Sequence, residues 1–277
     1  VFGIMAKMGF RGRATIAGID LGTTNSVICV QGQTGTDISI ECIPDPATGS
    51  PIIPSVVSFL ESHERKVGPS SKSLSLLNPH PSHVIVGGAA KKRIDTHPKS
   101  TVYNVKRVLG RSSDDAAVAA LAAESEFDIA TNNNGVDFML HHDRHVVSLS
   151  PPHVGAYVVQ HLSRIANAAL GHDNVKSAVI CVPAKFNAHQ RQETVRAFQM
   201  AGLSVARILE EPTAAALAYG LHRKPNVDYI LVYDFGGGTL DVSLLYVSEG
   251  FVDVMGSDGD DRLGGADFDA AIAHFLF

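Results

Sequence analysis

The sequence lacks several features that mark particular classes of protein. It has only three cysteines in 277 residues, and their spacing is typical of neither a disulfide pair nor a metal site. Cys29 and Cys181 lie in apolar strand patterns, so we expect them to be core residues in a reducing compartment. No apolar run reaches transmembrane length, and residues 1–13 contain no continuous apolar segment of a secretory signal. We therefore expect a cytoplasmic location and no membrane partner.

An excess of positive charge is also absent. The formal net charge is −5, with 23 Lys and Arg against 28 Asp and Glu, which argues against binding to nucleic acid or anionic membranes. The content of 45% hydrophobic and 18% charged residues is typical of a globular chain that buries a core. The length allows one large or two medium domains.

No GxxxxGK[ST] motif is present, so the chain does not contain the common nucleotide P-loop. Instead, residues 229–245 read YILVYDFGGGTLDVSLL, which predicts a strand, a glycine turn and a return strand. Three glycines allow backbone N–H groups to approach an anion. Asp234 and Asp241 flank the turn, and carboxylates beside a phosphate need a cation such as Mg²⁺ between them. We interpret this hairpin as a phosphate clamp; the alternative is an ordinary glycine hairpin.

A second stretch has the same pattern. Residues 16–30 read IAGIDLGTTNSVICV, again a strand, an aspartate, a Gly/Thr turn and a return strand. Aligning Asp20 with Asp234 also aligns Gly22 with Gly236. Because the turn returns to a strand rather than a helix, it is not a Rossmann fingerprint. Two such hairpins suggest two related lobes that hold the two sides of a polyphosphate.

These motifs resemble the signatures of the heat shock protein 70 chaperone family. IDLGTTNS and VYDFGGGTLDVSLL are similar to its first two signatures, and further matches lie at 86–111, 181–192, 208–221 and 263–269. The resemblance covers residues 14–277. It implies an α/β chain with the actin-like ATPase fold, built from two ribonuclease-H-like lobes of which the second is incomplete.

The resemblance also implies the division of the chain. We expect the first lobe at 14–54 and 151–225, a smaller inserted α+β lobe at 55–150, and the start of the second lobe at 226–277. The apolar end of the sequence suggests that the natural chain continues. Within the insert, 61–85 is predicted to be a long surface loop.

Local patterns predict several elements. We expect a helical stretch to begin with Ala89–Asp95. Four further helices are expected at Asp114–Glu124, Pro151–Leu170, 188–201 and Asp267–Phe277. Phe127–Val147 is predicted to form a hairpin, Phe251–Met255 a strand, and Gly256–Arg262 a polar loop. By resemblance, Pro183 and Arg191 match positions that relay the nucleotide state.

The resemblance implies a set of site residues. The catalytic candidates are Lys91, Glu211, Asp234, Asp241 and Asp20. The nucleotide-binding candidates are Gly22, Thr23, Thr24, Asn25, Gly236, Gly237, Gly238, Thr239, Gly264 and Gly265. The metal candidates are Asp20, Asp234 (through water) and Glu211. Lys91 matches the family's lysine that reaches the γ-phosphate; the alternative is a solvated surface lysine.

The implied function is Mg²⁺-dependent hydrolysis of ATP to ADP by the ATPase domain of a stress-response chaperone that assists protein folding. The implied cofactors are ATP or ADP, Mg²⁺ and K⁺. In the full-length protein the implied partners are unfolded client polypeptides, J-domain co-chaperones and nucleotide-exchange factors. We expect weak nucleotide binding and turnover from this fragment alone. The alternatives are a nucleotide-binding relative without turnover, or another actin-like ATPase or sugar kinase.

Overall fold

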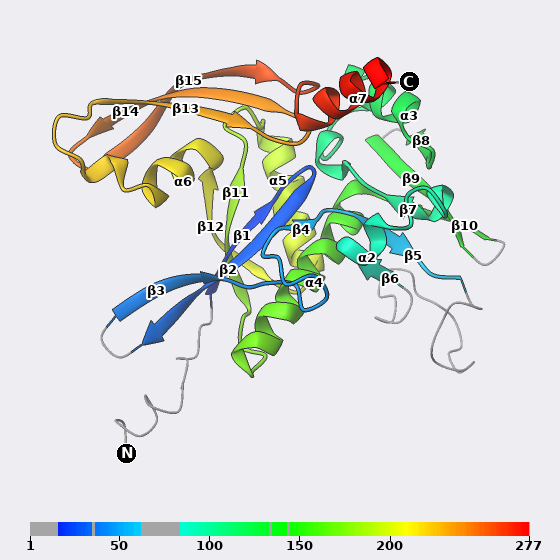
Figure 1. Ribbon diagram of the computed structural model, residues 1–277, viewed down its shortest axis with the longest axis horizontal. Coiled ribbons are helices and arrows are strands. Elements are labelled where there is room, and N and C mark those ends of the chain that lie inside the picture. Colours follow the sequence, from blue (N-terminus) through cyan, green and yellow to red (C-terminus); the bar gives the residue numbers. More distant parts are fainter. Residues whose placement is uncertain (1–15, 35–36, 62–83, 133–134, 143–144, 277) are drawn as a thin grey trace.

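The structure, a computed structural model, describes residues 16–34, 37–61, 84–132, 135–142 and 145–276 (Figure 1). The strands within these ranges form four sheets. The predicted surface loop at 61–85 lies almost entirely outside the described residues. Among the residues that are described, no helix combines the length and the apolar character needed to cross a membrane.

The largest sheet has six strands in the order β12-β11-β1-β2-β3, with β4 paired to β2. The strand β1 is antiparallel to β2 and parallel to β11, which is in turn parallel to β12. This arrangement joins segments that are about 160 residues apart in the sequence. The strands are β1 (Ile16–Leu21), β2 (Asn25–Thr34), β3 (Asp37–Cys42), β4 (Ile53–Pro54), β11 (Ser177–Val182) and β12 (Ser204–Glu210).

One face of this sheet forms the main core with helix α4 (Pro151–Leu170). Alternate residues of β1 are buried, with Ala17 and Ile19 each 1% exposed, as expected for a strand with one covered face. Helix α4 extends over the predicted residues and ends at Gly171, whose φ of 71° suits a glycine C-cap. Helix α5 (Ala188–Met200) packs against α4.

The segment between β4 and α4 forms two small sheets beside the main sheet (Figure 1). One has the order β6-β5-β7 and the other β10-β9-β8, so the predicted hairpin at 127–147 is a three-stranded meander. The elements are β5 (Val57–Phe59), β6 (Val84–Val86), α2 (Gly88–Lys91), η2 (Pro98–Ser100), β7 (Thr101–Val102), η3 (Val105–Arg107), α3 (Ala116–Glu124), β8 (Asp128–Asn132), β9 (Gly135–His142) and β10 (His145–Leu149).

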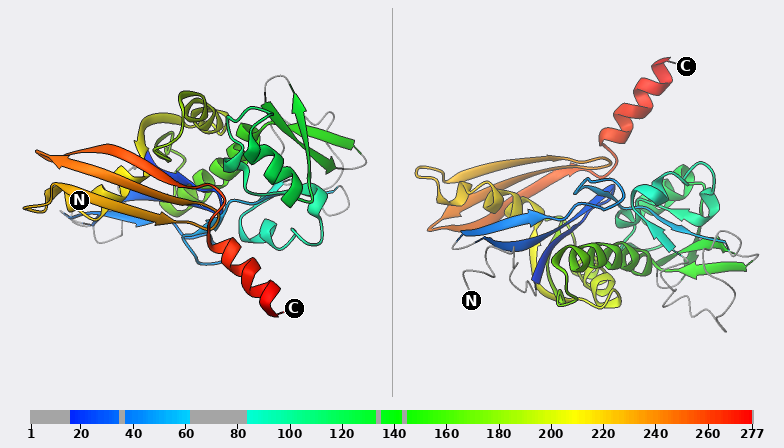
Figure 2. Two further views of the ribbon diagram at one scale, coloured as in Figure 1. Left: turned by 90° about the horizontal axis from the view of Figure 1, so that it is seen from above. Right: turned by 60° about the horizontal axis from the view of Figure 1, so that its bottom comes forward.

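The last sheet is a meander in the order β13-β14-β15, and helix α6 packs on one of its faces. Its elements are α6 (Glu211–Ala218), η4 (Leu221–Arg223), β13 (Tyr229–Phe235), β14 (Leu240–Ser248), β15 (Phe251–Asp260) and α7 (Gly265–Leu276). The helix α7 projects away from the sheet (Figure 2), and none of its described residues is buried.

Two predicted elements differ from the structure. Helix α2 stops at Lys91 instead of extending to Asp95, and turns follow it toward Pro98. The strand β15 continues to Asp260, where a polar loop was expected. The strand continues because β14 also pairs with this polar segment. The register shifts at a bulge near Leu244, and beyond the bulge Gly256–Asp260 of β15 pair with Leu240–Leu244 of β14.

The expectation about the cysteines was wrong for Cys29. Strands β2 and β3 place Cys29 directly opposite Cys42, and the two form a disulfide. The pairing depends on the register of two antiparallel strands, which a separation of 13 residues does not reveal. Cys181 is the free cysteine of the chain.

Candidate functional site

The two predicted hairpins face each other across one cavity of about 700 Å³. The turn after β1 and the turn after β13 both line it, together with η3, the turn after β11, and α6. Twelve of the predicted site residues lie in its wall: Asp20, Gly22, Thr23, Thr24, Asn25, Glu211, Asp234, Gly236, Gly237, Gly238, Thr239 and Asp241. The fold therefore brings together residues that are more than 200 positions apart.

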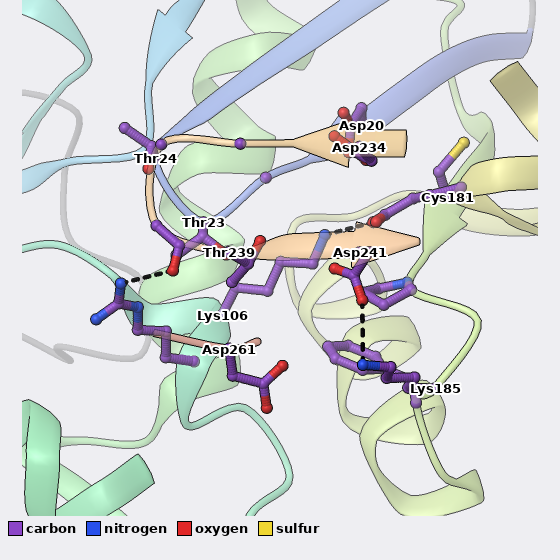
Figure 3. A pocket seen from close by; sticks show the side chains of 18 of the residues that line it. Asp20, Thr23, Thr24, Lys106, Cys181, Lys185, Asp234, Thr239, Asp241 and Asp261 are labelled. Carbon is purple, nitrogen blue, oxygen red and sulfur yellow. Dashed lines mark hydrogen bonds and ion pairs between the residues drawn. The ribbon is translucent and has the colours of Figure 1, made fainter. Parts of the chain in front are cut away.

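The two turns approach each other so closely that a side chain would not fit between them. A Cβ added to Gly237 would lie 2.5 Å from Oγ1 of Thr24, which is well inside van der Waals contact. Thr23, Thr24 and Thr239 lie on these two turns near the cavity (Figure 3). The turns thus present hydroxyl groups and backbone N–H groups to the same space, as an anion-binding site requires.

Gly264 and Gly265 do not line this cavity; they support the glycine turn from behind. The N–H of Gly265 donates to the carbonyl of Gly236 at 3.0 Å, and the N–H of Ala266 donates to that of Gly237 at 2.8 Å. The N–H of Gly264 donates to the Asp267 carboxylate at 2.7 Å. These N–H groups thus hold the glycine turn in this structure, and the nucleotide contact of the two glycines stays a prediction.

A lysine lies among the acids of the cavity, but it is not Lys91. The ammonium of Lys106 donates to the Glu211 carboxylate at 2.6 Å, and its side chain is only 9% exposed. Burial lowers the pKa of Lys106, but the carboxylates of Glu211 and Asp20 outweigh it and raise the pKa overall. Lys106 is therefore a fixed positive charge in the middle of the cleft (Figure 3).

The structure places the predicted residue Lys91 at the exposed end of α2, outside the lining of the cavity. Its role at the γ-phosphate, and the alternative of a solvated surface lysine, both stay predictions. Lys106 lies in the same matched stretch, 86–111, within VKRVL. Its apolar neighbours Val105, Val108 and Leu109 are a local indication of a partly buried cation, and that indication was missed.

Three aspartates of the cavity have raised pKa values. Desolvation in the cleft raises the pKa of Asp20, and the nearby carboxylates of Glu211 and Asp234 add to this effect, while Lys106 opposes it. Burial and Glu211 likewise raise the pKa of Asp234. Burial raises the pKa of Asp241 as well. A bound cation would reduce the repulsion between these carboxylates and favour their ionised form.

The chemistry of this set fits a hydrated Mg²⁺ with a phosphate. Carboxylates, phosphate oxygens and waters are the ligands that Mg²⁺ prefers, and it usually keeps several waters. Among the described residues, no three Asp, Glu, His or Cys side chains form a group that could hold a metal directly. The predicted contacts of Asp20 and Asp234 with the metal pass through water. The metal site to test is therefore one in which phosphate oxygens and waters are the direct ligands.

Basic side chains from the first part of the chain reach across the cavity to the last sheet. Arg107 donates to the carbonyl of Gly238 at 2.9 Å, and Arg111 pairs with Asp261 at 2.7 Å. Lys185 lies 3.8 Å from Asp241. The motifs did not indicate these three residues for the site, because their partners lie on the β13-β14-β15 sheet or in the turns beside it.

The two predicted relay positions differ in their place. Pro183 lines the cavity, whereas Arg191 is not among its lining residues and pairs with Glu210 at 2.7 Å. Cys181 also lines the cavity, and burial together with Asp20 and Glu211 raises the pKa of its thiol to about 11. At neutral pH this thiol is protonated and therefore a poor nucleophile.

The fold thus brings two Gly/Thr hairpins from distant parts of an α/β chain to one acidic cavity. The family model described as "Hsp70 protein" matches residues 16–84 and 75–277. The chain therefore belongs to the Hsp70 family and has its actin-like ATPase fold, as the motifs indicated.

The chain is 40% identical over 263 residues to the "Mitochondrial-type heat shock protein 70" of Encephalitozoon hellem. The match covers 95% of this chain but 39% of that relative. The name of the relative points to a mitochondrial-type protein, whereas the residues alone had favoured the cytoplasm.

Proposed function

We propose that this chain forms the first part of an ATP-binding and ATP-hydrolysing domain of an Hsp70-type chaperone. One observation carries the proposal: two Gly/Thr hairpins from distant parts of the sequence meet at one acidic cavity that contains the partly buried pair of Lys106 and Glu211. We also propose the lobes as 14–54 with 151–225, an insert at 55–150, and 226–277, because each of the four sheets falls within one of these units.

The hairpin turns would hold the phosphates. In this proposal Thr23, Thr24 and Thr239 donate hydroxyl hydrogen bonds to phosphate oxygens, and the backbone N–H groups near Gly237 add to them. Asn25 and Gly22 shape the first turn, where an added Cβ on Gly22 would overlap the carbonyl of Asn25. K⁺ is a further cation that the acidic cavity could accept.

The acids and the lysine would supply the charge needed for phosphoryl transfer to water. Bound Mg²⁺ would neutralise phosphate charge. In this proposal Asp20, Asp234 and Glu211 would accept hydrogen bonds from water bound to the metal, and Asp241 would orient the attacking water. Lys106 takes the electrostatic role first assigned to Lys91, because its ammonium is fixed in the cleft.

A melting titration of the 277-residue chain with Mg·ADP and Mg·ATP tests nucleotide binding. Ligand at about 100 times its Kd adds roughly 2.7 kcal/mol to the unfolding free energy, which raises the melting temperature by about 5–10 °C. We expect a shift that requires Mg²⁺. A folded chain that shows no shift at any nucleotide concentration would contradict binding by this part of the protein.

Turnover is tested by Lys106→Met with Lys91→Met as the matched control. Single-turnover hydrolysis should fall by about 100-fold or more for Lys106→Met, because a fixed charge near the transferred group is lost. Lys91→Met should hydrolyse ATP at the rate of the unchanged chain. The reverse result would return the catalytic role to Lys91.

The second candidate is nucleotide binding with little turnover. It is favoured by the 2.6 Å contact between Lys106 and Glu211, which engages the ammonium that catalysis would need. A chain that shows the Mg²⁺-dependent melting shift but the same negligible hydrolysis before and after Lys106→Met would support this second candidate.

The wider role belongs to the longer protein. We propose that such a protein binds unfolded client polypeptides, J-domain co-chaperones and nucleotide-exchange factors. Protein folding under stress would be its task. The resemblance to the family supports these partners.

A further inference from the structure

Lys185 lies in the turn between β11 and α5, at one end of the cavity. Its side chain is 32% exposed, so it belongs partly to the cleft and partly to the surface. The turn itself is part of the first lobe. Its position suggests a role because the side chain points toward the other lobe (Figure 3).

The turn that carries Lys185 is fixed on both sides of the residue. The guanidinium of Arg191 donates to the carbonyl of Ala184 at 3.1 Å and to that of Phe186 at 2.8 Å. The same guanidinium pairs with Glu210 at 2.7 Å, which ties the turn to the end of β12. Lys185 therefore projects from a braced backbone, and its four-carbon side chain is the part that can move.

The ammonium of Lys185 faces two carboxylates on the second lobe. It lies 3.8 Å from Asp241 on β14 and 3.8 Å from Asp258 on β15. Asp241 is 21% exposed, whereas Asp258 is fully exposed to solvent. The contact with Asp241 should dominate, because water and salt screen an exposed pair strongly.

Lys185 is the cation that balances the acids around Asp241. The carboxylates of Glu211, Asp261 and Asp234 raise the pKa of Asp241, and Lys185 lowers it. Lys106, the other lysine in the cleft wall, is engaged by Glu211. Without Lys185, the Asp241 carboxylate would therefore be repelled from the position it occupies.

We propose that Lys185 is a positioning residue that links the two lobes by holding the carboxylates of Asp241 and Asp258, and thereby fixes Asp241 in the cleft. The proposal rests on the proposed function, in which Asp241 orients the attacking water. Lys185 touches no reacting atom in this role. It acts through Asp241, from a turn that Arg191 holds in place.

A double-mutant cycle with Lys185→Met and Asp241→Asn tests the link in the chain without metal or nucleotide. We expect the two changes to be non-additive by about three- to fivefold in the unfolding equilibrium constant. The coupling should shrink in 0.5 M salt, since the Debye length falls to a few ångströms. Lys176→Met, an exposed lysine immediately before β11, is the matched control and should be additive with Asp241→Asn. Full additivity of Lys185→Met with Asp241→Asn would overturn the proposal.

Single-turnover hydrolysis tests the positioning. Lys185→Met should lower the rate constant by about 10- to 100-fold with little change in the half-saturating ATP concentration, because a water is misplaced while phosphate contacts remain. Lys185→Arg should restore most of the rate. An unchanged rate constant in Lys185→Met would overturn the positioning role.

Failure of the proposed function has a different signature. If the unchanged chain shows no Mg²⁺-dependent melting shift with ADP, nucleotide binding fails, yet the coupling between Lys185 and Asp241 is still measured by the cycle. If the shift is present and the cycle is additive, the proposed function stands and the Lys185 link is rejected.

Discussion

The two Gly/Thr hairpins, at residues 16–30 and 229–245, share a sequence pattern but bury opposite faces. When Asp20 is aligned with Asp234, Ile19 falls on Tyr233 and Ala17 falls on Leu231. Ile19 and Ala17 in the first hairpin are each 1% exposed. Their counterparts in the second hairpin, Tyr233 and Leu231, are 65% and 67% exposed. The same positions thus lie in the core in one hairpin and on the surface in the other.

The difference comes from the helix that covers each sheet. In the first hairpin α4 packs on the face that carries Ile19, and Ile16 on the other face is 48% exposed. In the second hairpin α6 packs on the opposite face, where Ile230 is 6% exposed. An apolar strand pattern therefore identifies the strand, but the covered face depends on a helix elsewhere in the chain.

The comparison predicts its largest effect at Ile19. Ile19→Ala should lower the unfolding free energy by about 2–5 kcal/mol, because it removes buried methyl groups and leaves a cavity. Leu231→Ala should change it by no more than about 0.5 kcal/mol, because the side chain is exposed. Urea unfolding of both variants measures the difference.

Leu245→Ala is the control for Leu231→Ala, since Leu245 lies in the same sheet but is fully buried against the α6 side. Leu245→Ala should lower the unfolding free energy clearly more than Leu231→Ala does. An equally large loss for Leu231→Ala would mean that the outer face of the second hairpin is covered in solution.

The fold was largely predictable because its motifs are local. The strand–aspartate–glycine pattern around Asp20 and Asp234 requires only neighbouring residues, and the apolar spacing of Pro151–Leu170 suffices for a helix. The extension of β15 was not predictable in the same way. Gly256–Asp260 is polar and glycine-rich, and it becomes a strand because β14 pairs with it.

We expect the second largest effect on the unfolding free energy from loss of the disulfide, which joins the first hairpin to β3. Replacing Cys29 and Cys42 together by serine should lower the unfolding free energy by roughly 2–3 kcal/mol, as expected for opening a loop of about this length. Urea unfolding without reductant measures the loss. The second hairpin contains no cysteine and should be unaffected.

Cys181→Ser is the control, because this thiol is free. In denaturant the unchanged chain should show one reactive thiol before reduction and three after it. Three reactive thiols before reduction would show that Cys29 and Cys42 are not paired in the preparation.

The candidate site was predictable where a residue lies in a motif and not where it depends on another lobe. Both hairpin turns were found from their glycines and threonines. The motif pointed to Lys91 and not to Lys106, since both lie in one matched stretch and only the structure shows which of them lines the cavity. The position of Lys185 was not predicted either, because its partner Asp241 is distant in the sequence.

A smaller effect is expected at the aligned aspartates. Burial raises the pKa of Asp20 and of Asp234 above the ordinary value of 3.8, so the folded chain binds these protons more readily than the unfolded chain. The unfolding free energy of the metal-free chain should therefore fall as the pH rises from 3.8 through the raised values. Neutralising either residue removes that penalty at neutral pH.

Asp20→Asn and Asp234→Asn should thus each raise the melting temperature of the metal-free chain at pH 7. Because both residues are accessible to solvent in the folded chain, screening should keep the gain below about 1 kcal/mol, so the rise should be no more than about 2–4 °C. Both changes should also weaken the Mg²⁺-dependent response to ADP. Calorimetry with and without Mg²⁺ measures both effects, and a lower melting temperature of the metal-free variants would contradict the charge penalty.

The smallest effect tests the exposed face of the second hairpin. Tyr229 and Tyr246 face each other across β13 and β14 with ring centroids 5.3 Å apart, and a cross-strand aromatic pair contributes about 0.2–1 kcal/mol. A double-mutant cycle with Tyr229→Ala and Tyr246→Ala should show coupling of this size in urea unfolding. Tyr233→Ala, whose residue lies opposite Val242, should be additive with Tyr246→Ala. If Tyr233→Ala and Tyr246→Ala were coupled as strongly as Tyr229→Ala and Tyr246→Ala, this face would be packed and not exposed. The two hairpins would then no longer differ in which face is buried.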